Sequence, residues 1–153
     1  MPAETDNTPA GKDLHAYINT GTYASPVWAE ILRIENLAAP RGKNTGPLKT
    51  RGSPWEKIVP GQKTHAISFN YIRKRATDAV FDDLQDSYDN DTHLQVALTD
   101  LPASDPAAVG TKAYYVVTKF DEKQDLENAW QHDVELALAE HFEAGTEVEP
   151  EAF

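Results

Sequence analysis

The chain has 153 residues and contains no cysteine. This absence excludes a disulfide framework, a thiolate metal site and a cysteine nucleophile. The sequence also lacks any apolar run long enough to cross a bilayer, and no membrane partner is expected. The opening MPAETDNTPAGKD has neither the basic nor the apolar segment of a secretory signal, so we interpret residues 1–13 as a flexible arm.

Positive charge is scarce, because 14 Lys and Arg residues stand against 25 Asp and Glu, which gives a formal net charge of -11. A protein this acidic repels phosphate and does not wrap nucleic acid. Residues 1–53 hold six cations and five acids, a net charge of +1, so the rest of the chain carries -12. This asymmetry suits a subunit that polymerises through complementary surfaces, although composition alone favours a solvated surface with chance asymmetry.

Alternation of apolar and polar residues predicts a mainly β structure. Residues 65–73, 93–100 and 131–140 place apolar side chains at every second position, as half-buried antiparallel strands do. β-Branched and aromatic content indicates further strands at 14–18, 28–35 and 112–120, where the alternation is less regular, and a weaker candidate at 53–58. Core packing is the expected role of the three tryptophans, Trp28, Trp55 and Trp130.

One segment has helical periodicity. Residues 77–90 place Val80, Phe81, Leu84 and Tyr88 at the spacing of one helix face, with Thr77 as the expected N-cap. The other face carries four aspartates and is expected to meet solvent or a partner: Asp82, Asp83, Asp86 and Asp89. We therefore predict one amphipathic helix packed on a sheet, with a strongly acidic outer side.

Two long linkers interrupt the strands, at 36–54 and 101–111. The first contains no acid and four cations, which are Arg41, Lys43, Lys49 and Arg51. A basic loop of this length is uncommon inside a compact domain. We interpret it as the tip of a long hairpin that projects from the domain and becomes ordered only against a neighbour.

The predicted architecture is a β-sandwich or open barrel with one packed helix and a long hairpin loop. It occupies residues 14–142, and residues 143–153 form an acidic C-terminal tail that is expected to be loose.

No catalytic, metal-binding or cofactor-binding signature accompanies this fold. The five histidines have no HExxH or HxH spacing, and exposed or strand-edge positions are expected for them. The segment DSYDND at 86–91 lacks the central Gly and the final Glu of a calcium loop. We therefore expect a protein that is not an enzyme and that uses no cofactor.

Five segments in order carry a family resemblance: INTGTYASPVWAEILRIENL, SPWEKIVPGQKTHAISFNYI, DAVFDDLQDSY, HLQVALTD and ENAWQHDVELAL. Together they resemble the tail tube, or major tail, proteins of long-tailed bacteriophages and related prophages. The resemblance covers about residues 14–140. In such a family, Gly21, Thr22, Tyr23 and Pro26 would fix how the first strand leaves the sheet, and Trp28 would begin the second.

The resemblance implies a structural virion protein that assembles in the host cytoplasm. Its subunits would form stacked rings, usually hexameric, with strands of neighbours joined into an inner barrel and the hairpin reaching an adjacent ring. The partners it implies are other copies of the chain, the tape measure, terminator and distal tail proteins, and double-stranded DNA passing through during ejection without specific binding.

Two residue assignments follow within this interpretation. The four cations of the 36–54 loop are expected to contact an acidic surface of a neighbouring subunit, for which the aspartate face of the 77–90 helix is a candidate. In the last strand, Val134, Leu136 and Leu138 would face the core, so Asp133 and Glu135 would lie on the opposite face. That face would meet either the outer solvent or, as we favour, an acidic lumen.

Three alternatives remain open from the residues. Another tail assembly protein, such as a terminator or a contractile-tail inner tube, would share the fold class. A ligand-binding or carbohydrate-binding β-domain would be a monomer with an apolar pocket lined by tryptophans. An enzyme ranks last, because the sequence has no recognisable nucleophile, metal or cofactor motif.

Overall fold

The computed structural model describes residues 14–74, 77–123 and 130–153, and the predicted arm at 1–13 lies outside them. The strands are β1 (His15–Asn19), β2 (Trp28–Glu30), β3 (Ile34–Ala38), β4 (Arg41–Leu48), β5 (Lys57–Ile72), β6 (Leu94–Thr99), β7 (Gly110–Lys123), β8 (Gln131–Leu138), β9 (Phe142–Glu143), β10 (Thr146–Glu147) and β11 (Glu151–Ala152), and the helix α1 spans Ala79–Asn90. The described helix is too short to span a membrane. The mainly β prediction with one helix is confirmed.

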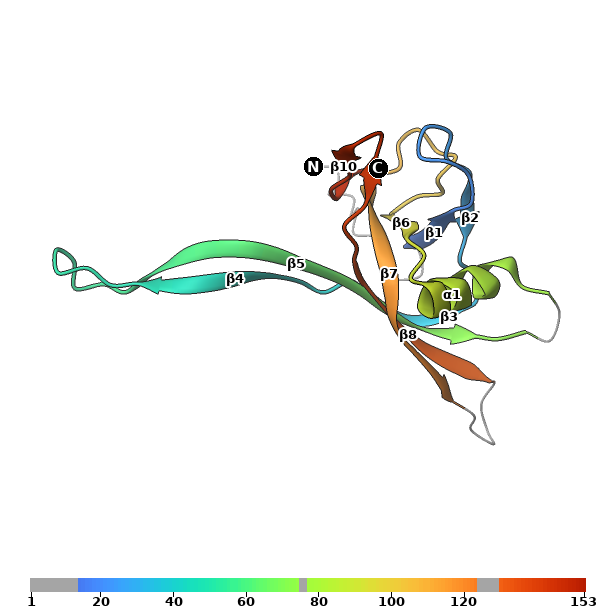
Figure 1. Cartoon of the computed structure of the whole chain (residues 1–153), viewed down its shortest axis with the longest axis horizontal. Helices are drawn as coiled ribbons and strands as arrows, with labels where there is room; N and C mark the ends of the chain where they lie inside the picture. The colour runs from blue at the N-terminus through green and yellow to red at the C-terminus, as the bar shows by residue number, and fades with distance from the viewer. Residues whose placement is uncertain (1–13, 75–76, 124–129) are drawn as a thin grey trace, which may run out of the picture.

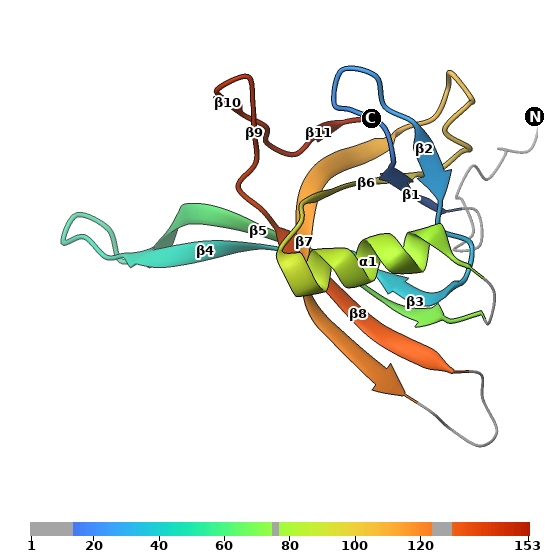
Figure 2. The ribbon, with the colours of Figure 1, turned by 45° about the vertical axis from the view of Figure 1, so that its right-hand side comes forward.

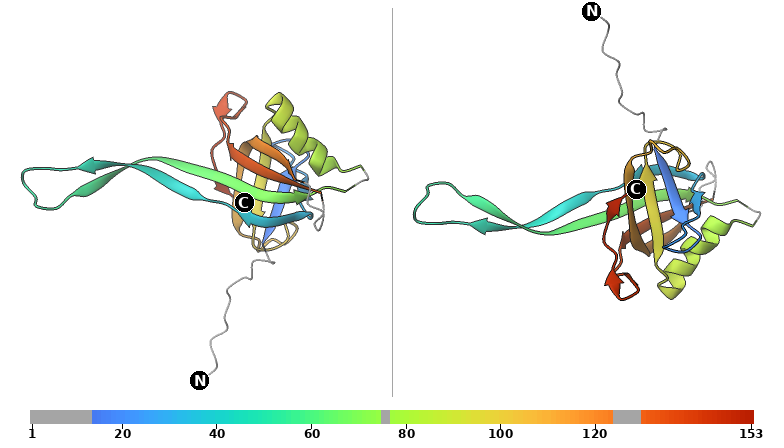
Figure 3. Two further views of the ribbon diagram at one scale, coloured as in Figure 1. Left: turned by 90° about the horizontal axis from the view of Figure 1, so that it is seen from below. Right: turned by 90° about the horizontal axis from the view of Figure 1, so that it is seen from above.

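The main sheet is antiparallel and has the strand order β2-β1-β6-β7-β8-β5-β3. It curls strongly into an open barrel, with α1 packed beside it and a long hairpin extending away from it (Figures 1 and 3). Strand β5 belongs to both parts. Its first half pairs with β4 in the hairpin, and its second half pairs with β8 and β3 in the barrel.

The core lies inside the curl of the sheet. On β8, Val134 and Leu136 are buried, and they stand opposite Phe69 and Ile67 of β5. The same inward face continues across β1, β6 and β7 through Ile18, Val96, Ala113, Tyr115 and Val117. This arrangement follows from the period of two in the sequence, because alternate side chains of a strand point to opposite faces.

Helix α1 closes one side of this core (Figure 2). Phe81, Leu84 and Ser87 are its buried residues. The Ser87 hydroxyl accepts a hydrogen bond from the backbone N–H of Val117 and donates one to the carbonyl of Thr92, so it ties the helix to β7. The N-cap is Asp78, not Thr77 as predicted, and its carboxylate accepts from the Phe81 N–H.

The turn after β1 is fixed by the Asn19 side chain. Its oxygen accepts from the backbone N–H groups of Gly21 and Val27, and its amide donates to Gln95 of β6. A Cβ at Gly21 would lie 2.6 Å from the carbonyl oxygen of Ser25, so the tight turn requires glycine there.

Two boundaries differ from prediction. The single strand expected at 28–35 is two strands, β2 and β3, separated by residues 31–33. The tail at 143–153 is not loose throughout, because β9 pairs with β10, and β11 pairs with β7. The ring of Phe153 packs against Trp28, and its N–H donates to the carbonyl of Gly110, so the C-terminus is held against the barrel.

His132 contradicts the expectation that histidines lie at exposed or edge positions, because it is only 3% exposed. Its ring stacks on Phe120 and packs against Phe81, which explains its burial. Neither ring nitrogen has a hydrogen-bond partner among the described residues. Burial is the main cause that lowers the pKa of His132, so the ring stays neutral near pH 7.

We expect His132→Phe to raise the free energy of unfolding at pH 7.5 by about 1 kcal/mol, because two buried unpaired nitrogens are removed. The wild-type protein should lose stability as pH falls below the ordinary histidine value of 6.5, because the unfolded chain gains a proton there and buried His132 does not. Urea unfolding at pH 7.5 and 5.5 checks both effects. An unchanged pH dependence in the variant would contradict the assignment.

Candidate assembly surfaces

The first candidate surface is the arm, defined here as residues 41–65, in which β4 pairs with the first half of β5. The registered pairs run from Arg41 opposite His65 to Leu48 opposite Lys57. The long hairpin predicted for this segment is therefore present. Its two strands already pair within one chain, which corrects the expectation that the segment becomes ordered only against a neighbour. Almost every side chain of the arm is exposed. An isolated two-stranded ribbon is marginally stable in water, so the arm has the properties of a segment that packs on a partner.

Large apolar side chains on the arm strengthen this interpretation. Trp55 is 75% exposed and Ile58 is 68% exposed, and Leu48 and Val59 are also exposed. The prediction that Trp55 packs in the core is therefore wrong, because this residue lies in the turn of the arm between β4 and β5. Exposed apolar groups of this size are typical of surfaces that bind another protein.

The arm is also strongly basic. It contains six cations and one acid, Glu56, a net charge of +5, which leaves -16 for the rest of the chain. The four predicted cations separate into two groups. Arg41 and Lys43 lie on β4 at the base, and Lys49 and Arg51 lie near the tip, where Lys49 is 4.0 Å from Glu56. Sequence reasoning missed Lys63 and His65, which the hairpin register places opposite Lys43 and Arg41.

The second candidate surface is the aspartate face of α1. Asp82, Asp86 and Asp89 are exposed and Asp83 is half-buried. Burial, followed by the charges of Asp82 and Asp86, raises the pKa of Asp83. The last turn of α1 has no basic residue, although the negative end of the helix dipole lies there. Among the described ion pairs, none involves these four aspartates.

The third candidate surface is the outer face of β8, where Asp133 and Glu135 lie opposite the core side. Both carboxylates are paired across the strands, Asp133 with Lys123 at 3.1 Å and Glu135 with Lys119 at 3.9 Å. Lys119 also lies 3.5 Å from Asp121. The two acids are therefore largely balanced within the chain, which the sequence did not indicate because the lysines lie on the neighbouring strand.

The fourth candidate surface consists of two strand edges of the same sheet. Among the described strands, β3 has only β5 beside it. Strand β7 pairs with β6 from Gly110 to Tyr115. From Thr118 to Lys123, β8 is the one strand beside it in the part of the chain that the structure describes. The two edges are therefore the two sides of a four-stranded part of the sheet with the order β3-β5-β8-β7. Unpaired edges present backbone groups to another strand.

The described residues contain no group of three or more His, Cys, Asp or Glu side chains placed to hold a metal ion. A pocket of about 510 Å³ lies at the base of the arm, and no tryptophan lines it.

Solved structures share this architecture, whereas no family model and no curated protein matches the sequence. The SPP1 tail tube superposes with a TM-score of 0.71 at 14% identity, over 86% of this chain and 76% of that one. The tail of an empty gene transfer agent particle gives a TM-score of 0.67 at 15% identity, over 86% and 95%. The sheath–tube complex of an extracellular contractile injection system gives 0.63 at 7% identity, over 97% and 93%. The chain therefore has the fold of tail tube proteins.

Proposed function

We propose that this chain is a tail tube protein, a structural virion component that polymerises into stacked rings and forms a conduit for DNA during ejection. The observation that carries the proposal is the pair of free edges on the sheet β3-β5-β8-β7. Ring closure would place β3 of one subunit beside residues 118–123 of β7 in the next, so that both edges become paired. This arrangement extends one sheet around the ring.

The arm supports the stacking of these rings. It is exposed, basic and apolar in part, and it extends away from the barrel (Figure 1). A ribbon of this kind gains stability when it lies on an acidic neighbour, and the rest of the chain carries -16. Rings that stack through arms make an open, heterologous assembly that grows along one axis.

We propose six subunits per ring. The structurally similar gene transfer agent tail was refined with C6 symmetry. The partners in the particle would be the tape measure, terminator and distal tail proteins. No enzymatic step belongs to the proposal, since the surfaces that support it act by packing and pairing.

Electron microscopy of the purified protein at increasing concentration tests the proposal. We expect hollow tubes, and a helical reconstruction should pair β3 with residues 118–123 of β7 across subunits. Closed rings that never stack would favour a terminator role instead. A protein that stays monomeric at concentrations near the millimolar range would overturn the proposal.

The outer face of β8 is proposed to line the lumen. Together with the neighbouring outer face of β7, this surface carries two positive and three negative charges, from Lys119, Lys123, Asp121, Asp133 and Glu135. Duplex DNA has one negative charge per about 1.7 Å of axis. A nearly balanced wall with a slight negative excess gives phosphates few fixed partners and does not attract them strongly.

We expect Asp133→Asn combined with Glu135→Gln to leave tube assembly intact and to make particles release DNA more slowly at low salt. Lys123 would lose its partner, Lys119 would keep only Asp121, and the face would change from a net -1 to a net +1. The slowing should fade at high salt, because phosphate contacts weaken with ionic strength. The measurement is DNA release from particles carrying the variant. A tube reconstruction with both carboxylates on the outer wall would contradict the assignment.

A further inference from the structure

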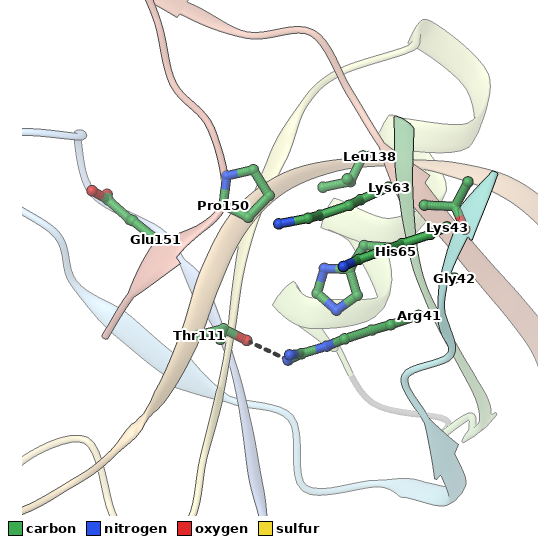
Figure 4. A pocket seen from close by; sticks show the side chains of 10 residues that line it. Arg41, Gly42, Lys43, Lys63, His65, Thr111, Leu138, Pro150 and Glu151 are labelled. Atoms are coloured by element: carbon green, nitrogen blue, oxygen red, sulfur yellow. Dashed lines mark hydrogen bonds between the residues drawn. The ribbon is translucent and has the colours of Figure 1, made fainter. Parts of the chain in front are cut away.

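The pocket at the base of the arm gathers positive charge from both strands of the hairpin. Arg41 and Lys43 of β4 and Lys63 of β5 point their charged ends into it, beside His65 (Figure 4). Residues Lys43 and Lys63 are direct cross-strand partners, as are Arg41 and His65. Like charges directly opposite each other destabilise an antiparallel pair. The hairpin therefore has an unfavourable arrangement that an anion between these side chains would relieve.

Among the described residues, one acid lines this pocket, and its charge is shared: Glu151 lies 3.7 Å from Lys112 on β7. Three further acids, Glu140, Glu147 and Glu149, line the adjoining pocket on the other side of Lys63, without forming an ion pair with it. Arg41 makes a hydrogen bond to the Thr111 hydroxyl at 3.4 Å, which is long and involves a neutral partner. No described ion pair involves Arg41, Lys43 or Lys63.

His65 completes the pocket without adding a charge at neutral pH. Its Nδ1 atom lies 2.8 Å from the Tyr115 hydroxyl, which fixes the ring against the barrel. Burial, and then the charge of Arg41, lowers the pKa of His65. The net positive charge of the pocket therefore comes from three side chains that are held on two paired strands.

From this arrangement we infer that the pocket is a carboxylate-binding site, and that its ligand is the aspartate face of α1 in a second copy of the chain. This inference rests on the proposed self-assembly and identifies one contact within it. Both surfaces carry unbalanced charge, of opposite sign, and both are present in every subunit.

The dimensions of the two surfaces agree. Asp82, Asp86 and Asp89 follow the spacing i, i+4, i+7, which places them along about 10 Å of one helix stripe. Arg41 and Lys43 are two residues apart on β4, which corresponds to about 7 Å along the strand. One turn or two of the helix can therefore lie across the pocket with two carboxylates near the three cations.

A charge exchange tests the pairing. Reversal of the pocket charges by Lys43→Glu with Lys63→Glu should raise the concentration needed for assembly about tenfold. Reversal of the helix charges by Asp82→Lys with Asp86→Lys should have the same effect. Circular dichroism should show that both variants fold as the wild type does. The four substitutions together should return this concentration to near the wild-type value. As a matched control, the pocket reversal combined with Asp100→Lys and Asp105→Lys, which lie between β6 and β7 outside the proposed contact surfaces, should not recover. No loss on pocket reversal, or recovery equal to that of the control, would overturn the inference.

Chemical crosslinking gives a second test that does not need tubes. The chain has no cysteine, so Lys43→Cys with Asp86→Cys introduces two unique thiols, and the remaining charges of both surfaces stay in place. A short bis-maleimide should link this variant into a ladder of multimers, whereas Lys43→Cys with Asp105→Cys should give dimers at most. Equal ladders, or none, would overturn the inference. If tubes form without the ladder, the inferred contact is wrong and the proposed tail tube function is unaffected. If the ladder forms without tubes, the contact is supported and the tail tube function is wrong.

Discussion

Reversal of Arg41, Lys43, Lys49 and Arg51 to glutamate is expected to leave a folded monomer that no longer forms tubes. The arm buries almost none of its side chains, so the barrel core does not depend on these four residues. Exposed ion pairs contribute about 0.5 kcal/mol each, so losing four raises the critical concentration for assembly about 30-fold. Repulsion between the new acids and the acidic neighbour adds to this loss.

The matched control keeps every charge, with Arg41→Lys, Lys43→Arg, Lys49→Arg and Arg51→Lys. We expect this variant to assemble at close to the wild-type concentration. Pelleting assays and negative-stain microscopy measure the assembled fraction, and thermal unfolding measures the fold. Tubes at normal yield from the glutamate variant would show that the basic arm does not act through charge.

The largest effect on stability is expected at Gly110, the first residue of β7. A Cβ at this position would overlap the carbonyl oxygen of Leu98 on β6. Gly110 also pairs with Thr99, and its carbonyl accepts from the N–H of Phe153. Gly110→Val should therefore disturb the β6–β7 ladder and release the C-terminus, with a loss of about 3 kcal/mol or more.

Gly46→Ala is the matched control for this substitution. A Cβ at Gly46 meets no atom within 4 Å, so the change in unfolding free energy should stay within about 0.5 kcal/mol. Urea unfolding of both variants decides the point. A Gly110→Val protein as stable as the Gly46→Ala protein would contradict the close approach of β6 and β7.

Elements that bury one face could be predicted from the sequence. The strand at 131–138 and the helix at 79–90 put apolar side chains on one side only, so periodicity identifies both. The arm has no such signal, since it is exposed on both faces, and its strand β4 reads RGKNTGPL, with the composition of a loop. Strands of two residues near the C-terminus are too short to produce a pattern.

The composition of the candidate surfaces depends on how neighbouring strands align, and the residue pattern within a single strand does not contain this register. Arg41 and Lys43 were identified as cations of a loop, but their meeting with Lys63 and His65 requires the turn of the hairpin. The pairing of Asp133 with Lys123 likewise depends on how β7 aligns with β8, including the irregularity between Val117 and Lys119. Local composition indicates which side chains are charged, whereas strand alignment decides which of them meet.

Strand β5 has a mechanical consequence for a stacked assembly. It runs without a break for 16 residues, from the arm into the barrel sheet, where it lies between β8 and β3. At about 3.3 Å per residue it spans roughly 53 Å. Tension between rings would pass along covalent backbone and resist elongation, whereas a two-stranded ribbon twists readily. In the proposed stacked assembly, each subunit would therefore resist extension along its arm and yield more readily to twisting of the arm.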